Sequence, residues 1–163
     1  FRDNWNGSKD TDISVGAYHV LKLDTDGTKQ AEHFINAVGE DLSGRLIPAV
    51  EVRLRGLYRL LPPDYYEAAD NLADFCDRIE KQYGVRPVIY CTERTYKNIV
   101  ASDSRFNKDK IWYESLFSKP DEDMDWTFWT YTNRVKFSFY ESGEYLHMTV
   151  FNGSEDDFKK LII

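Results

Sequence analysis

The sequence predicts an α/β fold in which about six mainly parallel strands form an incomplete or irregular TIM-type β/α barrel. Two observations predict it. Strand-like and helix-like segments alternate along the chain, and the strand-like runs are short, about five residues each, and rich in large apolar residues. A closed barrel of this type would need about two more strands. Because no repeat, low-complexity tract or linker interrupts the pattern, we expect one domain over residues 1–163.

The first part of the chain supplies a helix remnant at residues 1–10, a strand within residues 13–20 and a helix over residues 28–38. In that helix apolar residues recur at i, i+3, i+4 and i+7, which places them on one face. Thr28 can cap its start and Gly39 can end it.

The middle of the chain contains the strongest helix signal. A predicted strand at residues 45–52 is followed, after two prolines, by Asp64 and Glu67 at the spacing of a capping box. Gly84 can end this helix, and its apolar stripe predicts one buried face. The rest of the pattern predicts four further strands and two short helices. The strands lie within residues 86–92, 109–115, 126–132 and 145–151, and the helices within residues 92–100 and 154–162.

Composition and charge narrow the classes of function. Hydrophobic residues make up 42% and aromatic residues 15% of the chain, which is typical of a folded domain. The net charge of −7 argues against binding to nucleic acid or to an anionic membrane surface. No run reaches the roughly 20 apolar residues of a membrane span. Cys76 and Cys91 fit small buried side chains better than a disulfide framework. The three histidines lack the spacing of metal ligands, so neither a metal nor an organic cofactor is expected.

Candidate functional residues gather at the predicted carboxyl ends of the strands, where α/β folds bind ligands. Aromatic side chains near scattered polar groups suit a sugar, because ring faces stack on aromatic rings and hydroxyls need hydrogen-bond partners. An equally open interpretation is that half of these aromatics belong to the core. The predicted substrate-binding residues are Tyr18, His19, Arg53, Tyr90, Trp112, Trp129, Tyr131 and Thr149.

Several segments resemble the glycoside hydrolase family 25 lysozymes in order and spacing over essentially the whole chain. They are VGAYHV, QAEHFINAV, RLIPAVEV, YGVRPVIYCTERTY, IWYESLFSKP, WTFWTYTNR and VFNGSEDDF. The resemblance implies an irregular β/α barrel and cleavage of peptidoglycan between N-acetylmuramic acid and N-acetylglucosamine. It also implies a protein that acts on cell walls outside the membrane or as a phage lysin.

The sequence departs from the family pattern at the positions that carry catalysis. The family has Asp-x-Glu at a strand end, with the Glu as catalytic acid, and Glu51 and Arg53 stand at the matching positions. His147 and Thr149 stand where the family has Asp-x-Asn. The family's first strands, one of which carries a further site aspartate, would precede Phe1. A guanidinium cannot donate a proton, so we expect Glu51 and Arg53 to form an ion pair that is silent in the family's reaction.

Two residues remain as candidate proton donors. Glu51 is the nearest carboxyl group, although a cation on the same strand face should keep it ionised. His147 could donate a proton near neutral pH, although a lone histidine on a strand is more often structural. Glu93 and Glu114 are expected to be solvated surface charges just past strand ends.

Three interpretations therefore stay open. In the first, the chain is a lysozyme-like domain that binds peptidoglycan, a related glycan or a protein without cleaving it, or that has a structural role. In the second, it is a working muramidase with relocated acids, which can include a residue supplied by another chain. In the third, it is a piece of a barrel that another chain completes. Open sheet edges would also favour self-association into a homo-oligomer, because they expose unpaired backbone groups.

Overall fold

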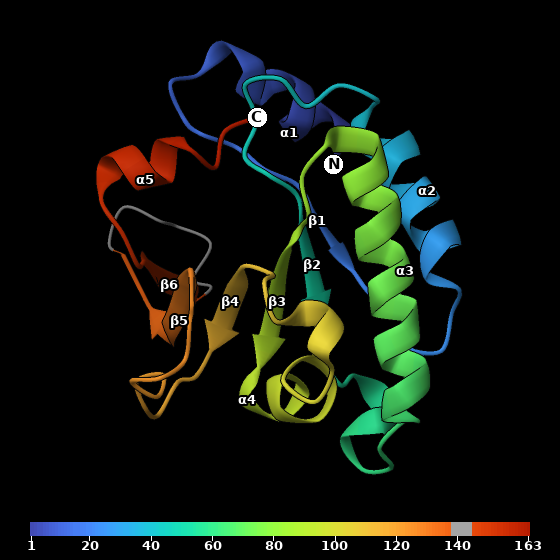
Figure 1. Cartoon of the computed structure of the whole chain (residues 1–163). Coiled ribbons are helices and arrows are strands. Elements are labelled where there is room, and N and C mark those ends of the chain that lie inside the picture. The colour runs from blue at the N-terminus through green and yellow to red at the C-terminus, as the bar shows by residue number, and fades with distance from the viewer. Residues whose placement is uncertain (138–144) are drawn as a thin grey trace.

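The computed structural model describes residues 1–137 and 145–163, and its centre is a six-stranded sheet (Figure 1). The strands lie in sequence order, with β1 to β5 parallel and β6 antiparallel to β5. This confirms the predicted α/β class and mostly parallel sheet. The strands are β1 (Tyr18–Val20), β2 (Ala49–Val52), β3 (Val88–Thr92), β4 (Ile111–Glu114), β5 (Phe128–Val135) and β6 (Leu146–Phe151).

Helices cover one face of the sheet and its ends (Figure 1). Two long helices lie side by side beyond β1 and β2, and short helical segments follow β2, β3 and β6. The helical elements are α1 (Arg2–Gly7), η1 (Ser8–Asp10), α2 (Gly27–Val38), η2 (Gly56–Arg59), α3 (Tyr65–Tyr83), α4 (Glu93–Thr95), η3 (Tyr96–Val100), η4 (Ser104–Phe106) and α5 (Glu155–Lys159).

The ends of the two long helices follow from local chemistry. Asp26 caps α2 by accepting a hydrogen bond from the Lys29 amide, so the cap lies two residues before the predicted Thr28, and the helix begins at Gly27. Gly39 ends it as predicted. Asp64 caps α3 by accepting hydrogen bonds from two backbone amides, and Gly84 ends α3 in the left-handed conformation at φ 74°.

The core lies between the helices and one face of the sheet. Alternation along β2 turns Val50 and Val52 toward α3, and both are fully buried. Cys76 and Cys91 are buried and free of disulfides, which confirms that they act as small apolar side chains. Burial raises the pKa of both thiols. The predicted strand over residues 13–20 is shorter than expected, because only its last three residues pair with β2.

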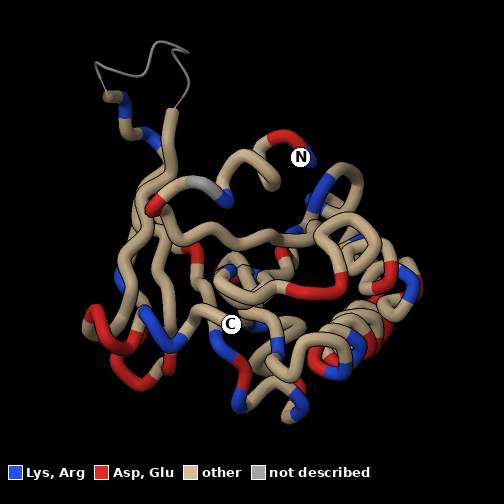
Figure 2. The backbone as a smooth tube through the Cα atoms, turned by 90° about the horizontal axis from the view of Figure 1, so that it is seen from above, with Lys and Arg blue, Asp and Glu red and all other residues tan. Residues whose placement is uncertain are grey.

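The sheet orients the site. The strands β2, β3 and β4 point the same way, and their carboxyl ends lie opposite the end at which both termini are found (Figure 1). Acidic and basic residues both occur along the outer helices (Figure 2), and α3 carries five acidic residues and two basic ones. Within the described part of the chain, no helix is both long and apolar enough to cross a bilayer. The outer strands of the sheet are β1 and β6, and self-association through them stays a prediction.

Candidate functional site

A pocket of about 330 Å³ opens at the carboxyl ends of the parallel strands. Its lining residues Glu51 and Arg53 alternate with Val50 and Val52, which face α3, so the pocket lies on the other face of the sheet. Its location follows from topology, because side chains at the ends of adjacent parallel strands converge. The strand registers bring Glu51 beside Tyr90, and Tyr90 beside Trp112. The pocket is lined by Tyr18, Ala49, Glu51, Arg53, Arg55, Arg59, Tyr90, Trp112 and His147.

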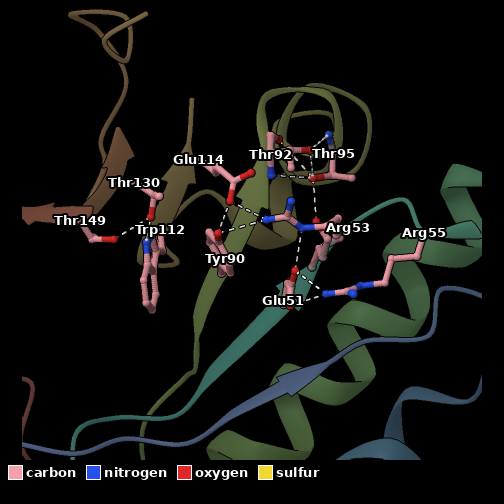
Figure 3. A network of polar contacts seen from close by, with 11 residues as sticks. Glu51, Arg53, Arg55, Tyr90, Thr92, Thr95, Trp112, Glu114, Thr130 and Thr149 are labelled. Carbon is pink, nitrogen blue, oxygen red and sulfur yellow. Dashed lines mark hydrogen bonds and ion pairs between the residues drawn. The ribbon is translucent and has the colours of Figure 1, made fainter. Parts of the chain in front are cut away.

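Arg53 is the centre of the pocket's polar network (Figure 3). Its Nε donates to Glu51 Oε1 at 2.7 Å, and its Nη2 donates to Glu114 Oε2 at 2.5 Å. The same nitrogen lies 3.1 Å from the Tyr90 hydroxyl. The Tyr90 hydroxyl in turn donates to Glu114. The predicted ion pair between Glu51 and Arg53 is therefore confirmed, and a second carboxylate completes it.

Glu51 is held by a second arginine. Arg55 Nη2 reaches both carboxylate oxygens of Glu51, at 2.9 and 3.0 Å. The Glu51 side chain is only 6% exposed, whereas the Arg55 side chain is 57% exposed, so Arg55 closes the network from the solvent side (Figure 3).

Glu114 was predicted to be a solvated surface charge, and this is wrong. Its side chain is 8% exposed and is bound by Arg53 and Tyr90. Burial alone would raise the pKa of Glu114, but hydrogen bonds from Arg53 and Tyr90, with the charge of Arg53, lower it below its usual value. Glu93 is exposed and pairs with Lys97 at 2.6 Å, in accordance with its prediction.

The pKa values of Arg53 and Tyr90 shift in the opposite direction to that of Glu114. Burial alone would lower the pKa of Arg53, but the hydrogen bond and charge of Glu114 raise it well above its usual value. Burial raises the pKa of Tyr90, and Glu114 raises it further. At neutral pH the pocket thus contains charged Arg53, ionised Glu114 and a neutral Tyr90 phenol.

Aromatic rings form the wall of the pocket beside this network. The Tyr90 and Trp112 rings lie 4.8 Å apart, and Phe128 follows Trp112 at 5.4 Å. Trp112 Nε1 donates to Thr130 Oγ1 at 2.8 Å, and Thr130 shares a hydrogen bond of 2.7 Å with Thr149 (Figure 3). These bonds fix the indole plane at the pocket wall.

The structure brings together most of the residues predicted to bind substrate, but not all. Tyr18, Arg53, Tyr90, Trp112 and the candidate donors Glu51 and His147 line the pocket. Thr149 adjoins it through Thr130. The remaining three predicted residues lie elsewhere: His19, Trp129 and Tyr131.

Strand alternation explains why these three are separate. His19 is paired with Val50 in the register, so its ring turns toward the helices, where it stacks on Phe75 at 5.1 Å. Trp129 is next to Trp112's partner Phe128 in β5 and therefore turns to the opposite sheet face. Tyr131 packs against Trp129 at 5.7 Å on that same face.

The sequence did not single out Arg55 and Arg59, which line the pocket, and it misjudged Glu114, which joins the pocket's polar network through Arg53. The run RLRGLYR directly after β2 carried a signal for the arginines, since a basic run after a strand end reaches the ligand-binding edge.

Among the described residues no group of three His, Cys, Asp or Glu side chains could hold a metal ion.

Comparisons of the sequence and of the structure with known proteins point to the same family. The sequence profile of the glycosyl hydrolases family 25 matches residues 1–138. The structure superposes on a family 25 glycosyl hydrolase from Bacillus anthracis with a TM-score of 0.86 and 30% identity, covering 100% of this chain and 75% of that chain. A bacterial lysozyme from Streptomyces coelicolor has the same fold, with a TM-score of 0.80 and 23% identity, over 99% of this chain and 78% of that chain.

Curated relatives are similar over the whole chain but longer. The uncharacterized protein YegX of Escherichia coli O157:H7 is 28% identical over 165 aligned residues, and that of strain K12 is 27% identical. Each alignment covers 99% of this chain and 57% of the relative, so the chain spans little more than half the length of these proteins.

Proposed function

Because this chain belongs to the glycosyl hydrolases family 25, we propose that it is a lysozyme-like domain that binds a peptidoglycan-type glycan in the Arg53 pocket and is impaired in cleaving it. The observation that carries the proposal is the pair of bonds from Arg53 to Glu51 and Glu114. They leave the pocket with aromatic walls and polar groups but with both of its carboxylates bound to cations.

The chemistry of glycoside hydrolysis explains why this matters. The reaction normally needs one carboxyl group that is protonated near neutral pH, so that it can donate to the leaving oxygen. Such a group is usually buried without a cation, which raises its pKa. Glu114 has the burial but is bound to Arg53, and its pKa is lowered. Glu51 is bound by two arginines.

Binding does not require such a donor. Tyr18 is 63% exposed and lines the pocket, so its ring is available to stack on a sugar. Trp112 and Tyr90 provide a fixed aromatic wall beside the charged groups. Their positions support the proposal that Tyr18, Tyr90, Trp112 and Arg53 are substrate-binding residues.

A working muramidase with relocated acids is the second candidate, and His147 favours it. This histidine lines the pocket and lies close enough to contribute to the low pKa of Glu114. Imidazole can donate protons near neutral pH. In this alternative His147 would be the proton donor, and Glu51 or the substrate's own acetamido group would act as the nucleophile or base.

Two assays on one set of cell walls separate the candidates. The proposal expects the purified chain to sediment with intact walls and to leave the turbidity of the suspension unchanged. Clearing of the suspension that disappears in Glu51→Gln or His147→Gln would contradict it and support the muramidase. Absence of both clearing and sedimentation would reject glycan binding itself.

A matched pair of tyrosine variants tests the pocket. Tyr18→Ala should weaken sedimentation with walls by about threefold to tenfold, because an aromatic contact is worth roughly 0.5–1.5 kcal/mol beyond the area it buries. Tyr66→Ala is the control, since Tyr66 is 87% exposed on α3 and does not line the pocket. Equal effects of the two substitutions would place the glycan elsewhere.

A further inference from the structure

Two arginines beside the pocket are not bound to a carboxylate. Arg59 ends η2 and Arg94 lies in α4, and both are exposed. Arg94 Nη1 lies 3.4 Å from the Arg59 carbonyl oxygen, so the loop after β2 and the helix after β3 bring them together. Over the described residues no ion pair to a carboxylate is formed by either side chain.

The neighbouring arginines differ in this respect. Arg53 and Arg55 are neutralised by the buried carboxylates of Glu51 and Glu114. The surplus positive charge at this edge of the sheet therefore belongs to Arg59 and Arg94. This surplus of positive charge contrasts with the rest of the chain, since the whole chain carries a net charge of −7.

The same two arginines line a second concavity. This pocket of about 230 Å³ is formed by Arg53, Leu54, Arg59, Thr92 and Arg94. It shares Arg53 and Arg59 with the larger pocket, so the two are adjacent. A ligand that fills the larger pocket would thus pass Arg59 on one side, with Arg94 immediately beyond.

From this geometry we propose that Arg59 and Arg94 form a subsite for an oxyanion, a carboxylate or a phosphate, carried by the glycan in the larger pocket. The inference rests on the proposed glycan binding and specifies the ligand class: acidic glycans are preferred over neutral ones. Guanidinium groups suit this role, because their planar donors match carboxylate and phosphate oxygens in pairs.

A nucleic acid or an anionic membrane would supply the same oxyanions but fits less well. Both present charge over a wide area and are bound by broad basic surfaces. Here acidic residues outnumber basic ones on α3 by five to two, and both signs occur along the outer helices (Figure 2). The surplus positive charge beside the pocket belongs to one pair of side chains. An acidic group on a chain of sugars matches that confinement.

Calorimetric titration with three oligosaccharide probes tests the subsite. The neutral probe is a tetramer of N-acetylglucosamine. The carboxylate probe is a tetrasaccharide in which N-acetylglucosamine alternates with N-acetylmuramic acid, and the phosphate probe is a short oligomer of glycosylated polyol phosphate. We expect at least one acidic probe to bind about tenfold more tightly than the neutral one, because a charge-assisted hydrogen bond contributes roughly that much.

The variant Arg59→Gln/Arg94→Gln should reduce the ratio of acidic to neutral affinity to about one. Its control, Arg2→Gln/Lys9→Gln, removes the same charge from exposed positions in α1 and η1 and should keep the ratio of the native chain. Circular dichroism of both variants confirms that they are folded.

Each result has one meaning. Equal affinity of the native chain for neutral and acidic probes overturns the subsite and leaves glycan binding standing. A preference that persists in Arg59→Gln/Arg94→Gln, or that falls equally in the control variant, also overturns it. If no probe binds the native chain, the proposed function fails as well.

Discussion

Replacing Arg53 by methionine should destabilise the protein strongly at neutral pH and far less in acid. The substitution keeps much of the side-chain length but removes the cation that binds Glu51 and Glu114. Breaking a buried ion pair from one side costs about 3–5 kcal/mol. Because the Arg53 side chain is 24% exposed, we expect a loss near the lower limit, about 3 kcal/mol.

The pH dependence follows from the carboxylate that is left behind. In the native chain the pKa of Glu114 is lowered, so its ionised form stabilises the fold above the ordinary value of 4.5, and this contribution is lost as the pH falls through the lowered value. Without Arg53, burial still raises the pKa of Glu114, and the hydrogen bond from Tyr90 and the nearby His147 are what remain to lower it. In acid, Glu114 of the variant can then bind a proton, which removes the cost of a buried carboxylate that has lost its cation.

Urea unfolding followed by tryptophan fluorescence at about pH 7.5 and about pH 4 measures both effects. The matched control is Arg55→Met, which removes the exposed partner of Glu51 and should cost about 1 kcal/mol or less. A loss that is the same at both pH values, or that is no larger than in Arg55→Met, would refute the account of Arg53 as the cation of a buried network.

Two further predictions concern the core. Gly27→Ala should destabilise the fold by about 3 kcal/mol or more in urea unfolding, since an added Cβ would lie 1.9 Å from the Asn71 carbonyl oxygen where α2 meets α3. Gly7→Ala is the control. Its Cβ would meet open space, so this substitution should be neutral or slightly stabilising. Cys76 and Cys91 should react with a thiol reagent near pH 8 only after denaturant is added, because burial raises both pKa values; labelling of either thiol in the native chain would contradict the described core.

The order of the elements could be predicted from the sequence because apolar periodicity and capping residues are local signals. The α3 helix illustrates this: Asp64, the apolar stripe and Gly84 each have one interpretation, and all three are found. The cap of α2 was predicted wrongly, because Asp26 and Thr28 are both good capping residues and only the backbone conformation decides between them.

The site was predicted less completely, because sequence does not state which face of the sheet a residue occupies. In β5, Trp129 and Phe128 are equally aromatic, but only one can face the same side as Trp112. Glu114 was missed for a related reason. A glutamate at a strand end is usually solvated, and its burial depends on Arg53, which is 61 positions away in the sequence.

Under the proposed function, one guanidinium accounts both for the stability of the pocket and for the absence of a proton donor. The contacts that make Arg53 stabilising are those that keep Glu114 ionised, so the two properties cannot be separated by a conservative change. Glu51 would keep Arg55 after loss of Arg53, whereas Glu114 would keep the neutral phenol of Tyr90 and the nearby imidazole of His147 but no hydrogen-bonded guanidinium. Of the two carboxylates, Glu114 is therefore the one that would gain acid character in Arg53→Met, in the same pH range in which that variant loses stability.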